Sequence, residues 1–577
     1  MHIQSLFPFY LLVALPHVLG QDNRNPVLND KTDAFINQVL ADWRSPGGVA
    51  VAVVRRDGLG AWNIETRGYG KATINGTKVT EKTLFGIGSN SKLFNVLATG
   101  LLINNETLSP RLSWTTKIAS VVPIWGLADS TASKEATILD VMSHRTGLPR
   151  HDYSYKWSDD VPTVIKKLKF QRPSAEFRDV FQYNNNMYTL LSYLPTVLLP
   201  SKVPLARYVK QHIFDPLAMT STTYSFEVAN SGGQLADGMV RQVTNVSDPF
   251  GGIPRAMPYW SVTGGEDGNV LSGAAGVISN AAIWLQTLLL DGTKPGTNQS
   301  VIPAAALQRV SAGITVEVAA ARFPELSPVV YGGGQARSTY RGHEIIKHDG
   351  AVPGFHTQIT RLPFDDLGVA VLTNDNDYGN LIMEVIKGNL LDEALGLEKI
   401  DWNSRYQALV STPLVPATPR PPNSPLPSVN FTSLAGTYNS GGYGKFELCL
   451  VKPHAPSASS SCMALAANIS SILPGAINTN IPTFIGTWDS PWLSHVRLTH
   501  FSGNLFNVSA LTSLPTGNAS APYWAYGDSV TDFGAYAEFV VSSRRHIGLG
   551  FTGIWGAESS LKGGPARERA EVWFDKA

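Results

Sequence analysis

The sequence predicts an α+β protein: an antiparallel sheet with flanking helices and a helical region, followed by a β-sandwich or barrel domain. Strand-like runs stand near both ends of the first 411 residues, and helical runs lie between them. Short strand-like runs separated by turns fill residues 429–577. At 577 residues, the chain is also longer than one ordinary domain.

The first 20 residues have the character of a secretory signal peptide. The apolar run at 6–15 is too short to span a bilayer, and residues suited to cleavage precede Gln21. We therefore expect residues 1–20 to be removed and the protein to be secreted; an apolar strand or anchor is the alternative. No other stretch is long and apolar enough for a membrane helix, so we expect no stable membrane span.

The first predicted domain covers residues 21–411. A run of Val and Ala after Gly48 ends at the turn signal Asp57-Gly58, and a second strand follows. The expected strands are 48–54, 61–69, 344–347, 357–361 and 368–373, and the expected helices include 136–143, 185–199 and 281–290. Strands at both ends with helices between them favour one antiparallel sheet packed against a helical region.

The predicted boundary is a proline-rich stretch. Seven prolines between Thr412 and Ser428 exclude a helix or a central strand there. We expect residues 412–428 to form a stiff, extended linker. The second predicted domain, residues 429–577, holds short β-rich runs with frequent turns, which are typical of a β-sandwich or a barrel.

Ser89 and Lys92 stand three residues apart, between a glycine-flanked turn and an apolar run of helical period. Ser89 is therefore expected at a helix start, with Lys92 one turn further on the same face. A desolvated, neutral lysine there can take the proton of the serine hydroxyl, as in Ser–Lys acyl-transfer enzymes. The alternative is a helix-capping serine beside a solvated lysine. The same spacing recurs at Ser559 and Lys562, where we expect only a surface loop.

Two further segments carry chemistry that such a site needs. Tyr183 and Asn185 stand just before a helical run; a phenol whose pKa is lowered by a lysine ammonium could shuttle protons, and the amide could bind a substrate carbonyl. His348 and Gly350 follow a strand whose edge can offer a backbone N–H to an oxyanion. Taken singly, each segment has an ordinary structural alternative. For Tyr183 and Asn185 it is a core tyrosine followed by asparagine caps, and for His348 it is a turn histidine.

Together these segments resemble the three motifs of the serine β-lactamase and penicillin-binding-protein superfamily, in its class C-like branch of esterases and D-aminopeptidases. The motifs S-x-x-K, Y-x-N and H-x-G stand in the family's order, as Ser89-Asn90-Ser91-Lys92, Tyr183-Asn184-Asn185 and His348-Asp349-Gly350. Supporting segments match at 142–148, 215–222, 272–276, 353–355 and 371–374. The resemblance covers about residues 30–400 and implies a β-lactamase/transpeptidase-like sheet with its helical region.

The resemblance also implies catalytic roles. Ser89 is the expected acylated nucleophile, and Lys92 and Tyr183 share its activation. Which of the two is the working base stays open, because they can titrate as a coupled pair.

The substrate-binding residues implied by the resemblance are Asn185, His348, Gly350 and Ala351, with the backbone N–H groups of Ser89 and Ala351 as the oxyanion hole. The third motif begins with His348 rather than the lysine of β-lactamases. A histidine is only partly charged near neutral pH, and in this family it is more typical of esterases and peptidases. Whether Asp349 holds His348 protonated stays open.

The predicted function is a secreted serine hydrolase that cleaves an ester, amide or lactam bond of a small molecule through an acyl-enzyme. The alternatives are an acyltransferase or transesterase acting on a small-molecule natural product, and a non-catalytic ligand-binding glycoprotein. No cofactor is implied, and two cysteines alone do not indicate a metal site. With 46 basic and 45 acidic residues, nucleic acid is not an expected partner. The oligomeric state stays open.

Two features fit export. The sequons that we predict to be glycosylated are Asn75, Asn105, Asn245, Asn298, Asn430, Asn468, Asn507 and Asn518. Cys449 and Cys462 are the only cysteines, and an oxidising compartment would let them form a disulfide. The sequence does not show whether their side chains meet.

Overall fold

The computed structural model describes residues 25–58, 60–245, 247–280, 282–411, 418–453, 459–478, 480–527, 535–542, 546–554 and 564–577. The predicted signal peptide, the linker residues 412–417 and the second Ser-x-x-Lys at 559–562 lie outside the described residues. The division of the chain at 412–428 stays a prediction. Within the described ranges, no helix combines the length and the apolar character needed to cross a bilayer.

An antiparallel sheet of eight strands organises the first part of the chain, in the order β2-β1-β12-β11-β10-β9-β8-β7. The strands are β1 (Gly48–Arg56), β2 (Trp62–Gly70), β7 (Thr315–Val318), β8 (Val329–Tyr331), β9 (Ala336–Tyr340), β10 (His343–Val352), β11 (Phe355–Leu362) and β12 (Leu367–Thr373). Strands from both ends of this part therefore meet in one sheet, as predicted, because β1 pairs with β12.

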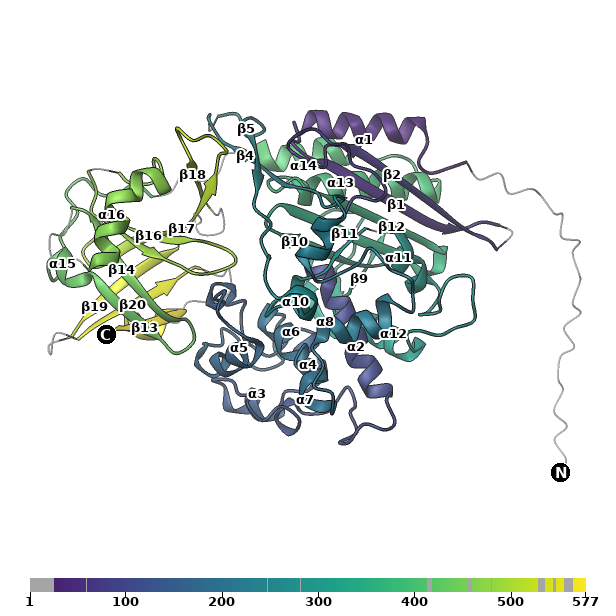
Figure 1. Ribbon diagram of the computed structural model, residues 1–577, viewed down its shortest axis with the longest axis horizontal. Coiled ribbons are helices and arrows are strands. Elements are labelled where there is room, and N and C mark those ends of the chain that lie inside the picture. Colours follow the sequence, from purple (N-terminus) through teal and green to yellow (C-terminus); the bar gives the residue numbers. More distant parts are fainter. Residues whose placement is uncertain are drawn as a thin grey trace, which may run out of the picture.

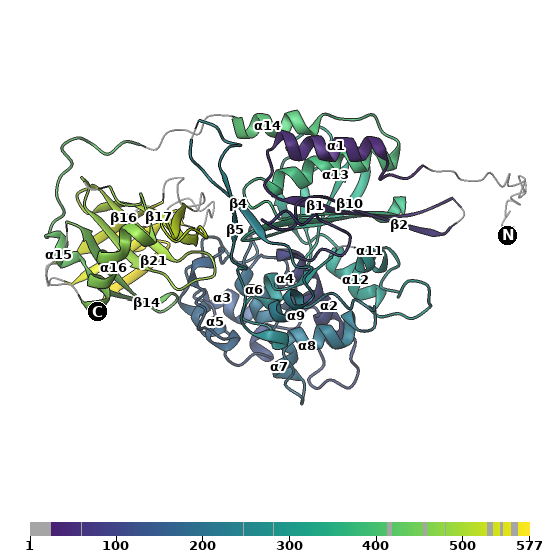
Figure 2. The ribbon, with the colours of Figure 1, turned by 45° about the horizontal axis from the view of Figure 1, so that its top comes forward.

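Helices cover both faces of this sheet (Figure 1, Figure 2). One face carries α1 (Asp30–Asp42), α13 (Gly379–Leu395) and α14 (Trp402–Ser411). The other face carries the helical region, which includes α2 (Ser91–Asn104), α6 (Asn185–Leu191), α8 (Leu205–Val209), α10 (Ser272–Ala275), α11 (Ala282–Leu289) and α12 (Ala304–Ser311). The remaining helices of this region are α3 (Ser130–Glu135), α4 (Ile138–Met142), α5 (Val161–Lys167), α7 (Leu194–Leu198) and α9 (Phe226–Ser231).

The sequence of β1 is apolar without an alternation of apolar and polar residues, and the position of the strand in the sheet explains this. Side chains of a strand point to opposite faces in turn, and both faces of this strand are covered. One core cluster takes Val49, Val51 and Val53. The other takes Ala50, Ala52 and Val54. The run after Gly48 therefore bridges the two hydrophobic cores.

The run at 185–199, expected to be helical, forms two helices instead of one. α6 ends at Leu191, and α7 begins at Leu194 with Pro195 in its first turn. Proline lacks the N–H that would continue the ladder of the preceding helix, so a new helix starts around it. At 136–143 the structure has α4, whose capping box joins Thr137 and Asp140.

Two short two-stranded sheets complete the first part. β3 (Phe85–Gly86) pairs with β6 (Ile278–Ser279), and β4 (Gly238–Gln242) pairs with β5 (Ile253–Met257). β3 leads directly into the turn that carries Ser89, so its pairing with β6 ties that turn to the helical region.

The second part is a closed barrel rather than a sandwich. Its strands are β13 (Gly436–Ser440), β14 (Gly444–Lys452), β15 (Thr483–Thr487), β16 (His495–Ser502), β17 (Leu505–Pro515), β19 (Tyr536–Val541), β20 (Ile547–Thr552) and β21 (Val572–Lys576). They follow the order β16-β15-β14-β13-β21-β20-β19-β17, and pairing of β16 with β17 closes the ring. β18 (Tyr523–Gly527) extends from β17. The helices of this part are α15 (Phe431–Leu434), α16 (Ser460–Ile472) and α17 (Ala566–Arg569).

Aromatic side chains fill the barrel and join it to the first part. Phe446, Phe484 and Phe574 belong to its interior cluster. The indole N–H of Trp488 donates to the backbone oxygen of Tyr153 at 2.9 Å. Trp492 stacks on Trp260 with ring centroids 5.8 Å apart. The barrel therefore packs against the helical region, as Figure 1 also shows.

Candidate active site

Ser89 lies in a short 3₁₀ helix, Gly88–Asn90, that leads into α2. Gly88 has a φ of +53°, and a Cβ atom there would lie 2.7 Å from the backbone nitrogen of Ala351. Only glycine allows both the left-handed backbone and this close approach. Asn90 Nδ2 donates to Thr357 Oγ1 at 2.9 Å, which fixes the turn against β11.

Lys92 is fully buried in the first turn of α2, with its Nζ 3.0 Å from Ser89 Oγ. Nζ also contacts Asn185 Oδ1 at 2.7 Å and the backbone oxygen of Ala274 at 2.9 Å. Both contacts are to neutral oxygens. Burial lowers the pKa of Lys92 well below its usual value, nearby Arg150 lowers it further, and Asp152 partly opposes this shift. The lysine is therefore disposed to lose its proton, as the sequence predicts.

Tyr183 donates a hydrogen bond from its hydroxyl to Ser89 Oγ at 2.8 Å. Its ring centroid lies 4.7 Å from Lys92 Nζ. Burial raises the pKa of Tyr183, although the hydrogen bond to Ser89 and the charge of Arg150 act in the other direction. The expectation that the lysine would lower this pKa is therefore wrong, because desolvation of the phenol is the larger effect.

Asn185, the first residue of α6, connects Lys92 to a carboxylate. Its Oδ1 faces Lys92, and its Nδ2 donates to Asp152 Oδ1 at 2.9 Å. Asp152 also accepts from Arg150 Nε at 2.8 Å. The guanidinium carbon of Arg150 lies 4.9 Å from the centroid of the Tyr183 ring. In this structure the Asn185 amide thus holds the lysine in place, and its predicted contact with substrate stays a prediction.

The Arg150–Asp152 pair was not among the residues singled out from the sequence. It directly follows the segment 142–148 that resembles a family turn. Spacing along the chain gives no sign that this loop folds back onto Tyr183 and Asn185, because those contacts span more than thirty residues. The one signal in the sequence for a role of Arg150 and Asp152 is that this charged pair lies close to the segment 142–148, which resembles a family turn.

His348, on β10, is held by two hydrogen bonds. Its Nδ1 lies 2.6 Å from the backbone oxygen of Asp349, and its Nε2 lies 2.9 Å from Tyr331 OH. A carbonyl only accepts, so Nδ1 carries the proton and Nε2 accepts from Tyr331. Burial, together with nearby Lys92, lowers the pKa of His348 to about 4. His348 is thus neutral near pH 7.

This geometry answers the question that the sequence left open about Asp349. Its carboxylate accepts from Gln358 Nε2 at 2.7 Å, and only its backbone oxygen contacts the His348 ring. The carboxylate does not keep the histidine charged. Tyr331, which lies on the separate strand β8, was missed because nothing in its local sequence marks it.

Gly350 and Ala351 lie where β10 passes the Ser89 turn. A Cβ atom on Gly350 would lie 2.0 Å from the backbone oxygen of Ile87, so a larger residue would push the turn away. Pairing of β10 with β9 ends at Lys347, which leaves the stretch from His348 onward without a β9 partner in the described chain. The exposed Ala351 and the Ser89 turn therefore meet at an open strand edge, which supports the predicted oxyanion hole.

The structure thus brings Ser89, Lys92, Tyr183 and Asn185 into one hydrogen-bond network. The ring of His348 lies 6.4 Å from the ring of Tyr183, centroid to centroid. The amine and the phenol thus both contact the serine hydroxyl, and the imidazole lies beside the phenol ring.

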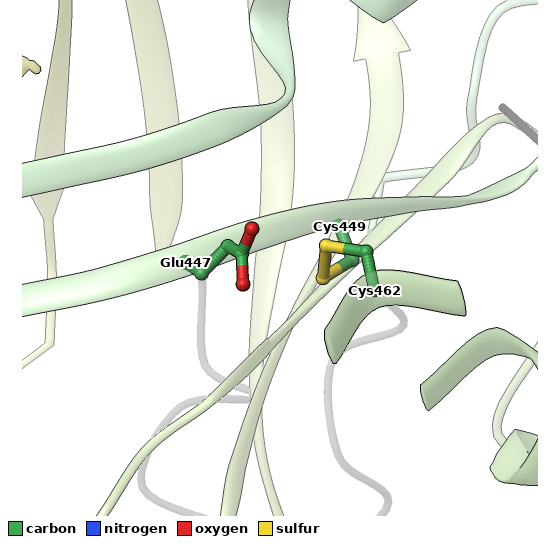
Figure 3. A group of neighbouring side chains, drawn as sticks. All are labelled: Glu447, Cys449 and Cys462. Atoms are coloured by element: carbon green, nitrogen blue, oxygen red, sulfur yellow. A yellow bond between two sulfur atoms is a disulfide. The ribbon is translucent and has the colours of Figure 1, made fainter. Parts of the chain in front are cut away.

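The predicted cysteine pairing is confirmed: Cys449 and Cys462 form a disulfide with Cα atoms 5.2 Å apart. Together with Glu447 they are a group of potential ligands within 4.8 Å (Figure 3). Metal binding by cysteine requires a thiolate, and both sulfurs are engaged in the disulfide. The Glu447 carboxylate accepts from the hydroxyls of Ser459 and Ser461. The group therefore does not fit a metal centre.

Seven of the predicted glycosylation sites are exposed: Asn75, Asn245, Asn298, Asn430, Asn468, Asn507 and Asn518. Asn105 is half-buried. Exposure is what attachment of a glycan requires, and glycosylation itself stays a prediction.

Comparisons with known proteins agree with the motifs. A sequence profile described as Beta-lactamase matches residues 33–382. A protein named unguisins hydrolase from Aspergillus violaceofuscus (strain CBS 115571) is 30% identical over 463 residues, covering 74% of this chain and 78% of that protein. A second unguisins hydrolase, from Aspergillus campestris (strain IBT 28561), is 29% identical over 434 residues, covering 70% and 76%.

A solved structure is similar in fold to both parts of the chain. The octameric penicillin-binding protein homologue from Pyrococcus abyssi is 16% identical and superposes with a TM-score of 0.51, covering 95% of this chain and 99% of that one. At this identity the match concerns the fold alone. The profile, by contrast, spans more than half of the sequence. The chain belongs to the β-lactamase family.

Proposed function

We propose that this protein is a secreted serine hydrolase that cleaves an ester, amide or lactam bond through an acyl-enzyme on Ser89. The observation that carries the proposal is the position of the Ser89 hydroxyl, 3.0 Å from the amine of a buried lysine and 2.8 Å from a phenol. The names of two relatives, unguisins hydrolases, support hydrolysis. Secretion rests on the character of residues 1–20.

In the proposed mechanism Lys92 is the base. Its lowered pKa provides a neutral amine, and its contacts with two neutral oxygens do not compete for the Ser89 proton. Ser89 Oγ attacks the substrate carbonyl as its proton passes to Lys92 Nζ. The backbone N–H groups of Ser89 and Ala351 stabilise the oxyanion.

Tyr183 completes the proton path. Its raised pKa keeps the phenol protonated, so its hydroxyl donates to Ser89 Oγ or to the leaving group rather than acting as a phenolate. When the tetrahedral intermediate collapses, Tyr183 protonates the leaving group and recovers a proton from the Lys92 ammonium. Water then attacks the acyl-enzyme by the same route in reverse, which frees the carboxylic acid and restores the Ser89 hydroxyl.

The neutral His348 informs the choice of substrate. A histidine with a pKa of about 4 offers no fixed charge at neutral pH for the carboxylate of a β-lactam antibiotic. Esters and peptide amides are therefore the favoured substrates, and an unguisin is the natural first compound to test, given the names of the relatives.

A substrate panel tests the proposal. Wild-type protein and Ser89→Ala are assayed with p-nitrophenyl esters, D- and L-aminoacyl amides, an unguisin and nitrocefin, and mass spectrometry locates the acyl adduct. Ser231→Ala, an exposed serine in α9, is the matched control and is expected to keep wild-type turnover. We expect Ser89→Ala to lose both turnover and adduct. Wild-type turnover by Ser89→Ala would overturn the proposal.

The same panel separates the two alternatives. Added alcohols reveal an acyltransferase if transfer to them is faster than hydrolysis in water. A non-catalytic ligand-binding protein would form no adduct with any acyl donor, and its binding would survive Ser89→Ala.

A further inference from the structure

The segment 151–153 belongs to the first part of the chain, but the barrel holds both of its outer residues. His151 Nδ1 lies 2.8 Å from the hydroxyl of Tyr443, in the turn between β13 and β14. The backbone oxygen of Tyr153 accepts from the indole N–H of Trp488, directly after β15, at 2.9 Å. The Tyr153 side chain also packs against the barrel core. The position of the residue between them is therefore set from the barrel.

The contact between His151 and Tyr443 has a defined direction. His151 Nε2 lies 2.9 Å from the backbone oxygen of Arg172, and because a carbonyl only accepts, Nε2 carries the proton. Burial lowers the pKa of His151 to about 4, so the ring is neutral near pH 7 and its Nδ1 accepts. Burial raises the pKa of Tyr443 well above its usual value, so the phenol keeps its proton and donates to Nδ1. His151 thus bridges the barrel and the helical region without a charge.

The backbone of His151 also needs this support. Its φ of +48° lies in the left-handed region, where a side chain crowds the backbone. A residue other than glycine stays in such a conformation only where its surroundings hold it. The Tyr443 hydroxyl and the Arg172 carbonyl hold the ring from two sides.

The middle residue of the segment, Asp152, leads directly to the reactive groups. Its Oδ1 accepts from Asn185 Nδ2 at 2.9 Å, and Asn185 Oδ1 lies 2.7 Å from Lys92 Nζ. Its Oδ2 pairs with Arg150 Nε at 2.8 Å. A shift of the segment by about 1 Å would take these contacts beyond hydrogen-bond distance. The amide would then no longer hold the amine beside Ser89.

A third contact joins the barrel to the hairpin that carries Ala351. Asn376 Nδ2 donates to the hydroxyl of Tyr526, on β18, at 2.9 Å. Asn376 Oδ1 accepts from the backbone N–H of Gly354 at 2.8 Å. Gly354 lies in the tight turn between β10 and β11, three residues after Ala351. The barrel thus supports both the base and the proposed oxyanion hole.

We propose that the barrel is a positioning domain for the Ser89 site. Tyr443 and Trp488 fix the segment 151–153, and the carboxylate of this segment keeps the amide that holds Lys92 in place. Both act through that carboxylate, so they are positioning residues rather than catalytic residues. The inference rests on the proposed hydrolase function, which it extends to residues of the second part of the chain.

Removal of one hydroxyl tests the proposal. Tyr443→Phe deletes the donor to His151 and keeps the ring in the barrel core, and we expect labelling of Ser89 by a fluorophosphonate to slow about tenfold. The matched control is Tyr438→Phe, another buried barrel tyrosine, whose hydroxyl donates to the backbone oxygen of Leu434 at 2.6 Å. It should label at the wild-type rate. Wild-type labelling of Tyr443→Phe, or equal slowing of both variants, would overturn the proposal.

A double-mutant cycle separates positioning from a general loosening of the fold. Asp152→Ala removes the carboxylate that the barrel positions, so adding Tyr443→Phe to it should slow labelling by less than about twofold more. A merely structural role of Tyr443 would give the same slowing with and without the carboxylate. A further slowing of about tenfold in the combined variant would therefore contradict positioning through Asp152.

Amide hydrogen exchange measures the placement of the segment without any activity. The N–H of Ser154 donates to the backbone oxygen of His151 at 3.0 Å and reports on the segment. We expect its exchange to be at least about fivefold faster in Tyr443→Phe and unchanged in Tyr438→Phe. Wild-type exchange in Tyr443→Phe would overturn the proposal. A wild-type protein that is never labelled at Ser89 would instead refute the proposed hydrolase function, whatever the exchange shows.

Discussion

Lys92 Nζ lies 2.7 Å from Asn185 Oδ1, so a neutral amide occupies the position where a carboxylate would hold the lysine charged. The carboxylate of Asp152 stands on the far side of that amide, 2.9 Å from Asn185 Nδ2. Arg150 pairs with Asp152 there. The protonation of Lys92 is therefore set by burial and by two opposite charges that do not touch it.

Those two charges predict opposite shifts in the pH dependence of acylation. Asp152 raises and Arg150 lowers the pKa of Lys92, so Asp152→Asn should lower this pKa and Arg150→Gln should raise it. We expect the acidic limb of the rate profile to move to lower pH in the first variant and to higher pH in the second, each by up to about one unit. Rates of labelling by a fluorophosphonate between pH 5 and 10 measure the limb. Shifts of the same sign in both variants would contradict Lys92 as the base.

The hydroxyl of Tyr183 should matter to the rate far more than to stability. Tyr183→Phe removes the donor 2.8 Å from Ser89 Oγ, and we expect turnover to fall about a hundredfold or more. The matched control is Tyr224→Phe, because the buried Tyr224 hydroxyl has no partner among the described residues. Steady-state kinetics and thermal unfolding of both variants provide the comparison. Equal losses of activity in the two variants would exclude a proton-transfer role for Tyr183.

Much of this site could be predicted because its first contact is local. Ser89 and Lys92 lie one helical turn apart, so their proximity follows from the helix alone. Tyr183 and His348 were predicted from the order of motifs rather than from geometry. The sequence did not predict Asp152, Arg150 or Tyr331 as site residues. They reach the site only through packing between distant segments, which no periodic pattern records.

The barrel shows a similar limit on the scale of a domain. The sequence indicated short strands but could not choose between a sandwich and a barrel. The choice depends on β13 pairing with β21, through Tyr438 with Lys576 and Asn439 with Asp575. These partners lie at opposite ends of the second part of the chain, and alternation within a strand does not reveal which distant strand it joins.

The neutral state of His348 predicts how stability changes in acid. Its pKa falls from the usual 6.5 to about 4 in the folded protein, so between these values the unfolded chain binds a proton that the folded chain does not. Stability from this group is present above pH 6.5 and is lost as pH falls toward 4. His348→Gln should therefore flatten the pH dependence of unfolding in this window, by an amount on the order of 3 kcal/mol.

Urea unfolding at pH 7.5, 6 and 4.5 measures this slope, whatever the absolute stability of the variant. The control is His546→Gln, at an exposed position, which should keep the wild-type slope. A wild-type slope in His348→Gln would show that the imidazole is not held neutral.

The buried carboxyl group of Glu317 should make the folded protein less stable as pH rises, the opposite of the effect of His348. It is the bulged residue of β7, between Val316 and Val318, and its buried Oε2 has no hydrogen-bond partner among the described residues. Burial raises its pKa to about 7, with Asp349 adding to the shift and Lys347 opposing it. The folded chain thus holds a proton between pH 4.5 and 7 that the unfolded chain has lost, so stability from this group is greatest below 4.5 and is lost as pH rises through 7.

Glu317→Gln removes this titration while keeping the shape of the side chain. We expect its stability to match that of the wild type near pH 4.5 and to exceed it at pH 8 by about 1–2 kcal/mol, a figure reduced for the partial exposure of the residue. Glu81→Gln, at an exposed position, should change neither value. A variant less stable than the wild type at pH 8 would mean that the ionised carboxylate has a partner that stabilises it.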